Sequence, residues 1–395
     1  MMTTSKIIVF FLLLLYFTFL TFKDLISIDI GFVVRVPHLL IGLCFIIILL
    51  YSLSLHNKLK LKYLWALFIV FLVVSILNYS IFNVYFYYIL LIIVTSISIF
   101  EVLSYFKVSA VEVARLLVLT TLVPIILSYL TITRPWYGGY QIISYSDFST
   151  FFATQLSIIF PFIFYIKKRI NRLLIGFVYV ITLILLAARG PILALLISYM
   201  VFNFKNIRIR TILGLVLTGS FLYAINQNLI NYYLSKLNPY SENYAALSDL
   251  NRWAYILATL SYLPSVLVVF IGNGIKYNKT IIYDYFARGG FSFTPLDDAT
   301  VHNIFLEIYS DYGIIIVFCV LFYMLYIFIS INRLVHPDKV PFLISITIFF
   351  INYNLEPNYV HYFFWTMLAF YYYGYNQLKI NSMEMLRTEY ANSYS

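Results

Sequence analysis

Arg189 is a charged residue in an otherwise apolar part of the chain, and this contrast marks it as a candidate for chemistry. The stretch 173–204 has no other charge, and basic residues flank it on both sides. Because both flanks favour the cytoplasm, the chain is expected to cross a membrane and return, with the turn at 187–191 near the outer surface. A charge at that depth is costly and usually has a partner or ligand. We predict that Arg189 binds an anionic group and that Gly190 shapes the turn; the alternative is an arginine that snorkels and anchors the turn.

Arg252 falls near the start of a predicted amphipathic helix. Ser-Asp at 248–249 offers an N-cap for a helix over 250–263, and Pro264 ends it. Apolar residues recur along this helix at helical spacing, so it is expected to lie on or dip into a membrane surface. Arg189 is expected to lie in a polar depression just below the outer surface. In the first turn of its helix, Arg252 would point towards the same depression. The alternative is a solvated surface arginine.

His302 and Asn303 open another apolar stretch, and Gly313 follows eleven positions after the histidine. Over that distance a continuous helix turns by roughly 1100°, so Gly313 would share a face with His302, about three turns deeper. A glycine there lets a neighbouring helix approach closely, which would hold the helix in place. A histidine at the outer edge is suited to take a proton from a hydroxyl group. The alternative is a capping or packing histidine.

Weaker candidates share a predicted position at the outer surface or just below it. Those assigned to substrate binding are Arg134, Asn303, Asp298 and His361. Arg134 lies in an aromatic, glycine-rich loop suited to sugar stacking, and Asp298 is close enough in sequence to orient His302. Glu307 and Asp311 fall within the following span, where they would pair with basic residues or line the cavity.

The composition indicates how these residues are held. Hydrophobic residues make up 63% of the chain and charged residues 11%, whereas a soluble domain carries roughly a quarter charged residues. Only helices and closed barrels satisfy their own backbone in lipid, and barrel strands would alternate over ~10 residues. The sequence therefore predicts an all-α, polytopic membrane protein. About twelve spans of a length that crosses a bilayer are expected, at 6–22, 36–55, 63–82, 84–105, 109–130, 149–166, 173–188, 190–204, 211–226, 302–330, 340–353 and 361–378.

Lysines and arginines concentrate in short loops on one side of these spans, which places both termini in the cytoplasm. The net charge of +10 then reflects cytoplasmic loops rather than nucleic-acid binding. The chain is expected to divide into spans 1 to 9 over 1–226 with an outer loop at 131–148, a large outer loop with the amphipathic helix over 227–301, spans 10 to 12 over 302–378, and a cytoplasmic tail over 379–395.

No glycine-rich phosphate loop and no carboxylate-X-carboxylate pair on an outer loop occurs in the sequence. The available cations are arginines, whose guanidinium groups bind phosphate through paired hydrogen bonds without a metal. The sequence therefore predicts neither a metal nor another cofactor.

The order of these motifs resembles the O-antigen polymerase/ligase superfamily. In that family a span ends at an Arg-Gly turn, a large periplasmic loop contains an arginine-bearing amphipathic helix, and a His-Asn…Gly segment opens the next span. The matching positions are Arg189-Gly190, Arg252 and His302-Asn303…Gly313, within roughly 170–330.

The resemblance implies a GT-C-like fold and an inverting, metal-independent glycosyl transfer at the periplasmic face of the bacterial inner membrane. The donor would be an oligosaccharide on undecaprenyl diphosphate. Arg189 and Arg252 would bind the diphosphate, and His302 would deprotonate the acceptor hydroxyl. Fixed cations ease departure of a diphosphate, and a neutral imidazole activates a nucleophile, so the physical chemistry agrees. The expected partners are the lipid-linked substrates and the bilayer, with a chain-length regulator as a further candidate and no nucleic acid.

The ligases of this superfamily resemble His-Asn/Ser/Gln, nine residues, Gly, two residues, and then Gly, Thr or Tyr. This chain matches through Gly313 but has Ile316 at the last position, which favours a Wzy-type repeat-unit polymerase over a ligase that transfers glycan to lipid A core. A flippase or other transporter would instead need ionisable residues along a path in both halves of the chain, whereas the outer candidates concentrate in 134–302. A scaffold subunit would tolerate loss of both arginines and the histidine.

Overall fold

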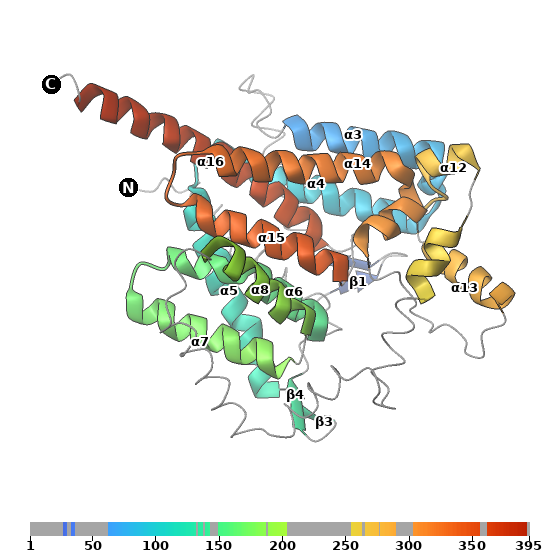
Figure 1. Ribbon diagram of the computed structural model, residues 1–395, viewed down its shortest axis with the longest axis horizontal. Coiled ribbons are helices and arrows are strands. Elements are labelled where there is room, and N and C mark those ends of the chain that lie inside the picture. Colours follow the sequence, from blue (N-terminus) through green and yellow to red (C-terminus); the bar gives the residue numbers. More distant parts are fainter. Residues whose placement is uncertain are drawn as a thin grey trace.

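The computed structural model describes residues 27–29, 33–35, 62–131, 133–136, 139–142, 149–186, 189–203, 254–262, 265–275, 277–289, 303–355 and 362–392. Over these residues the chain is mainly helical (Figure 1). The labelled helices are α3 Lys62–Leu77, η1 Ser80–Phe82, α4 Val84–Tyr105, α5 Ala110–Thr131, α6 Ser149–Ile159, η2 Phe160–Tyr165, α7 Arg169–Leu185, α8 Arg189–Asn203, α12 Val266–Ile271, α13 Tyr277–Gly289, α14 Ile304–Arg333, α15 Lys339–Leu355 and α16 Tyr362–Asn392.

Two small antiparallel hairpins accompany the helices. Strand β1 (Ser27–Asp29) pairs with β2 (Val33–Arg35), and β3 (Thr133–Trp136) pairs with β4 (Gly139–Ile142). The second hairpin lies inside the predicted outer loop at 131–148. The prediction of a helical fold is thus confirmed for the apolar stretches that the structure describes, while short strands occur between them.

Each predicted span from 63–82 onwards corresponds to a helix, apart from 211–226, which lies outside the described residues. The agreement is closest at α4, whose bounds equal the predicted 84–105. The predicted spans at 6–22 and 36–55 also lie outside the described residues. At the other end, α16 continues to Asn392, so most of the predicted tail is helical.

Within the described residues, one helix, α14, is long and apolar enough to cross a membrane. Shorter apolar helices accompany it, and their outer faces carry large apolar side chains. Ile69 on α3, Leu173 on α7 and Phe322 on α14 are 57%, 63% and 64% exposed. Such an apolar exterior is unusual for a soluble helical protein. The count of about twelve membrane spans stays a prediction.

The helices pack as two groups on either side of α15 (Figure 1). On one side α3, α4, α14 and α16 lie together, and on the other α6 and α8 pack on α15 while α5 and α7 lie beyond. A single apolar core runs through both groups. The first part of α14 is held between α15 and α3, with the rings of Phe305 and Phe350 5.7 Å apart and those of Phe71 and Tyr312 4.7 Å apart.

Tyrosine contributes more to this core than its preference for membrane interfaces suggests. The hydroxyl of Tyr179 donates to the backbone oxygen of Val118 at 2.9 Å, and that of Tyr323 donates to the backbone oxygen of Leu368 at 3.1 Å. Both tyrosines are buried. Because a buried hydroxyl must find a partner, these bonds fix how neighbouring helices sit against each other. Part of the high tyrosine content is thus structural within the bundle.

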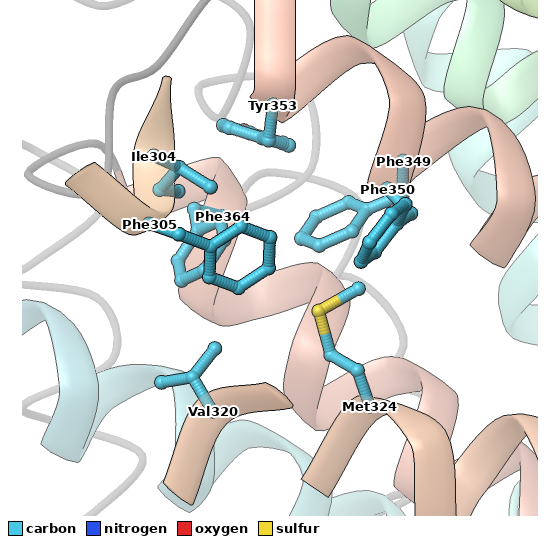
Figure 2. A pocket seen from close by; sticks show the side chains of 8 residues that line it. All are labelled: Ile304, Phe305, Val320, Met324, Phe349, Phe350, Tyr353 and Phe364. Atoms are coloured by element: carbon cyan, nitrogen blue, oxygen red, sulfur yellow. The ribbon is translucent and has the colours of Figure 1, made fainter. Parts of the chain in front are cut away.

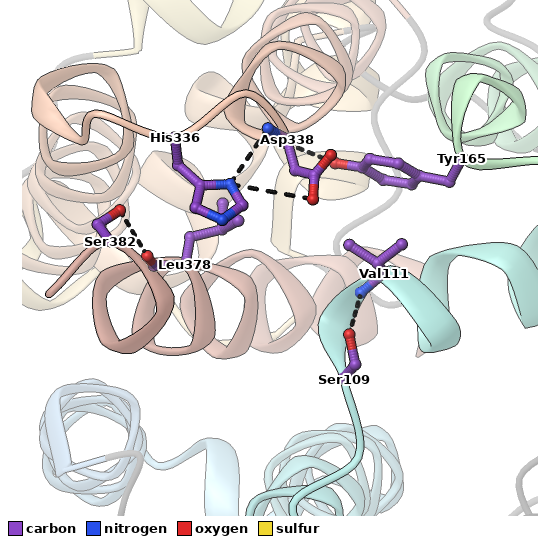
Figure 3. Close-up of polar contacts among 7 residues, drawn as sticks. All are labelled: Ser109, Val111, Tyr165, His336, Asp338, Leu378 and Ser382. Atoms are coloured by element: carbon purple, nitrogen blue, oxygen red, sulfur yellow. Dashed lines mark hydrogen bonds and ion pairs between the residues drawn. The ribbon is translucent and has the colours of Figure 1, made fainter. Parts of the chain in front are cut away.

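Three connections gather at one end of the helices, those joining α4 to α5, η2 to α7 and α14 to α15 (Figure 3). The hydroxyl of Tyr165 donates to the backbone oxygen of Asp338 at 2.5 Å, and His336 Nδ1 lies 3.9 Å from Asp338 Oδ2. Tyr373 on α16 donates its hydroxyl to the backbone oxygen of Val108. The sequence predicts all three connections on the cytoplasmic side, whereas the start of α14 lies at the opposite end.

Candidate functional site

Only some of the candidate site residues lie within the part of the chain that the structure describes. Arg252 and His302 lie outside the described residues, as do Asp298 and His361. Arg189 begins α8, with Gly190 as its second residue, and Arg134 pairs with Gln141 between β3 and β4. The side chains of both arginines lie outside what the structure describes. The helices and strands that carry these residues, or that follow them, therefore indicate where the site lies.

A helix occupies 254–261, inside the range where the sequence predicts one around Arg252. Its buried face presents Tyr255 and Ala258 to α13, with the rings of Tyr255 and Phe286 5.7 Å apart. Its other face leaves Leu257 52% and Leu260 61% exposed. The helix is thus amphipathic in the sense predicted, with one face on the protein and an apolar face uncovered.

Leu306 joins the same small apolar cluster as Ala254, Tyr255 and Ala258. Leu306 lies in the first turn of α14, which begins two residues after His302. The helix that follows Arg252 and the helix that follows His302 therefore belong to one apolar cluster, which Ile282 and Phe286 of α13 complete. These segments are far apart in the sequence, and this shared cluster is the observation on which the site depends.

Asn303 is the N-cap of α14. Its Oδ1 accepts hydrogen bonds from the backbone N–H groups of Phe305 at 3.0 Å and Leu306 at 3.1 Å. Its Nδ2 donates to Asn354 Oδ1 at 3.1 Å, near the end of α15. Both ends of the side chain are engaged, so Asn303 holds the start of α14 against the end of α15. The substrate contact predicted for Asn303 from the sequence stays a prediction.

Replacing Asn303 by alanine is expected to destabilise the protein by about 1–3 kcal/mol, because it removes two capping bonds and one bond between helices. Asn303→Asp keeps the capping oxygen and adds a favourable charge at a helix N-terminus, but loses the donor to Asn354. We expect its melting temperature in detergent to lie between those of wild type and Asn303→Ala. Equal melting temperatures for all three proteins would contradict the capping role.

Gly313 interrupts α14, with φ 73° and ψ −178°. The predicted span at 302–330 is therefore not one continuous helix, and α14 consists of two helical segments that meet at a kink at Gly313. Gly272, directly after α12, has nearly the same backbone conformation, with φ 75° and ψ −175°.

These two glycines cross each other at very short range. A Cβ on Gly313 would lie 2.3 Å from the backbone oxygen of Phe270, and a Cβ on Gly272 would lie 2.3 Å from the backbone oxygen of Asp311. Two backbone bonds join the segments, from Asn273 N to the oxygen of Ser310 at 3.1 Å and from Gly274 N to the oxygen of Asp311 at 2.9 Å. We call this arrangement the glycine crossing. A neighbouring helix thus approaches Gly313 closely, as expected, and it is the C-terminal end of α12.

Polar side chains reach the glycine crossing from several elements. Asp311 is 1% exposed, and Ser310 donates its hydroxyl to the backbone oxygen of Glu307 at 2.9 Å. The hydroxyl of Tyr262 donates to Asn273 Oδ1 at 3.1 Å. Partial burial raises the pKa of Tyr262, which keeps this hydroxyl protonated as a donor. Glu307 and Asp311 lie about one helical turn apart in the first segment of α14. Of these two carboxylates, Asp311 is buried at the glycine crossing.

An apolar pocket lies directly beneath the start of α14 (Figure 2). Its lining includes Ile304, Phe305, Val320, Met324, Phe349 and Phe350. The pocket is too narrow to admit a water molecule, and the rings of Phe305 and Phe350 lie 5.7 Å apart. It therefore serves as packing that holds the start of the helix.

No protein-family model matches the chain, and no curated protein matches it either. The functional assignment therefore depends on the residues and on the elements that carry them.

Proposed function

We propose that this protein is a glycosyltransferase of the bacterial inner membrane that polymerises undecaprenyl-diphosphate-linked oligosaccharide repeat units at the periplasmic face. The observation that carries the proposal is the packing of Leu306 against the cluster that Tyr255 and Ala258 form with α13. The helices that follow Arg252 and His302 in the sequence thus share one apolar cluster. The motif order of the O-antigen polymerase/ligase superfamily supplies the chemistry.

Several features support a multi-pass membrane location with both termini in the cytoplasm. The helices expose large apolar side chains, and α14 is long and apolar enough to span a bilayer. The loops at one end of the bundle carry basic residues such as Lys107, Lys168 and Lys339, as expected for the cytoplasmic side. The helix at 254–261 and the start of α14 would then face the periplasm.

In the proposed reaction, the acceptor hydroxyl of one repeat unit attacks the anomeric carbon of another. The bond between that carbon and the diphosphate oxygen breaks, undecaprenyl diphosphate leaves, and the anomeric configuration inverts. His302 takes the proton of the attacking hydroxyl. Arg189 and Arg252 stabilise the negative charge that develops on the diphosphate. The reaction needs no metal, because the two guanidinium groups supply the cationic charge.

The test uses purified protein, lipid-linked repeat units and a metal chelator, with chain growth followed on gels. We expect elongation that continues in the chelator. Arg252→Ala should lower the rate about 10²–10³-fold, the range found when one group that stabilises developing charge is removed. Arg252→Lys should recover little of this loss, because a lysine cannot bind phosphate through a planar pair of donors.

Arg288 provides the matched control, because it lies in the same predicted outer loop at the end of α13 and is exposed. Arg288→Ala should retain the wild-type rate. Repeat units that remain single with wild-type protein would reject the polymerase. Transfer only to lipid A core would favour the ligase, and elongation that stops in the chelator would reject the metal-free reaction.

A further inference from the structure

Asn78 joins two segments that come from much later in the chain. It follows α3 directly and is 8% exposed. Its Nδ2 donates to the backbone oxygen of Ile271 at 2.9 Å and to the backbone oxygen of Asp311 at 3.0 Å. Ile271 precedes Gly272, and Asp311 lies two residues before Gly313. One side-chain amide therefore bonds to both segments of the glycine crossing, the end of α12 and the first part of α14.

The chemistry of the amide suits this position. A helix leaves its last carbonyl groups without partners inside the helix, and α12 ends at Ile271 while the first segment of α14 ends at the Gly313 kink. A buried carbonyl at the end of a helix needs a hydrogen-bond partner. The NH₂ group of asparagine has two hydrogens, so Asn78 can donate to one carbonyl from each segment, and the oxygen of Asp311 also accepts from Gly274 N at 2.9 Å. Neither serine nor an apolar residue offers two such donors.

Ser80 extends the same contact. Its backbone N–H donates to Asn78 Oδ1 at 3.1 Å, and its hydroxyl accepts from the backbone N–H of Ile275 at 3.1 Å. Beyond it, Asn273 accepts from Tyr262 at the end of the segment 254–262. The turn after α3 is therefore connected to the crossing and, through the crossing, to the element that follows Arg252.

We propose that Asn78 is a positioning residue that holds the segment 265–275 against the first half of α14, so that the parts of the chain carrying Arg252 and His302 keep a fixed relation. This inference rests on the proposed function. Asn78 acts through the backbone of the two segments and not through the substrate. Its loss should therefore affect turnover more than binding of the lipid-linked donor.

The test combines amide hydrogen exchange with steady-state kinetics on Asn78→Leu, Ser80→Ala and the control Ser345→Ala. Ser345 is buried and also makes two bonds between elements, to the backbone oxygen of Ile158 at 2.7 Å and to Tyr371 OH at 2.9 Å. In Asn78→Leu we expect faster exchange at Asn273 and Gly274, kcat lowered by about tenfold or more, and KM within about twofold of wild type, because a small misplacement costs mainly turnover. Ser80→Ala should give a smaller change in the same direction.

Ser345→Ala should lose thermal stability without this fall in kcat. Unchanged exchange at Asn273 and Gly274 in Asn78→Leu would overturn the inference, and so would a fall in kcat no larger than that of Ser345→Ala at equal stability. If Asn78→Leu does not fold, Ser80→Ala and Asn78→Asp, which keeps the oxygen that accepts from Ser80, decide by the same two measurements. Failure of the proposed function is a different outcome. The wild-type protein would then not elongate chains, while the exchange rates at Asn273 and Gly274 would still show whether Asn78 holds the glycine crossing together.

Discussion

Replacing Gly313 by alanine is expected to prevent the protein from reaching its native state, with a loss of more than about 4 kcal/mol, the range that marks exceptional substitutions. The added Cβ would overlap the backbone of Phe270 at 2.3 Å, and φ 73° with ψ −178° lies in a region that only glycine adopts readily. Backbone cannot move aside as a flexible side chain can. The measurement is the monodisperse fraction and the melting temperature of the detergent-extracted protein.

Gly272→Ala should fail in the same way, because its Cβ would overlap the backbone of Asp311. The two effects should not add, since both substitutions disrupt one contact. Gly176 on α7 is the matched control, because a Cβ there meets nothing within 4 Å. Gly176→Ala should be neutral or stabilising by up to ~1 kcal/mol, as in an exposed helix. A Gly313→Ala protein with the melting temperature of wild type would contradict the close backbone approach at the glycine crossing.

His302→Ala is expected to abolish chain elongation, with a loss of about 10²–10⁴-fold in rate, the usual contribution of a positioned general base. The protein should still insert and melt near the wild-type temperature, because Asn303 retains the cap of α14. Elongation and melting temperature, measured on the same preparation, separate this effect from that of Asn303→Ala, which lowers stability.

His336→Ala serves as the control for His302→Ala. His336 lies between α14 and α15, at the end of the bundle opposite to the start of α14 (Figure 3). This variant should elongate chains at the wild-type rate. A His302→Ala protein with wild-type elongation would exclude the histidine as the base, and an inactive His336→Ala protein would show that histidine loss acts through folding.

The sequence predicts helix positions well where a long apolar run has clear limits. The bounds of α4 equal the prediction because Asn83 precedes the apolar run and Lys107, with φ 51°, lies in the turn after it. The start of α14 is predicted within two residues because Asn303 is a favourable N-cap. These are local signals, and local signals suffice for helix limits.

The kink at Gly313 could not be predicted in this way, because a single glycine between helix-forming residues gives no local sign of an interruption. The kink coincides with a close backbone approach of the segment that contains Phe270 and Gly272, and this contact between distant parts of the sequence leaves no periodic pattern. The Gly-Asn-Gly triplet at 272–274 was the available signal for an unusual turn. The role of Asn78 had no signal, since a single asparagine after an apolar stretch is common at the end of a helix.

The candidate site, too, could be predicted from the sequence only in part. Motif order pointed to Arg252 and His302, and the helices that follow them share one apolar cluster with α13. The polar residues around that cluster are set by tertiary structure and could not be predicted. The same holds for Tyr179 and Tyr323, because their hydroxyl groups bond to carbonyl groups of neighbouring helices.

The glycine crossing also constrains the order in which the chain can assemble. Asn78 precedes Ile271 by 193 residues and Asp311 by 233. At typical synthesis rates the ribosome needs on the order of 10–50 seconds to cover that distance. The amide therefore exists long before its acceptors, and a truncated chain ending before Asp311 can never satisfy both hydrogens. The glycine crossing is therefore completed late in synthesis, and a nascent chain that stalls upstream leaves the Asn78 amide without these two acceptors.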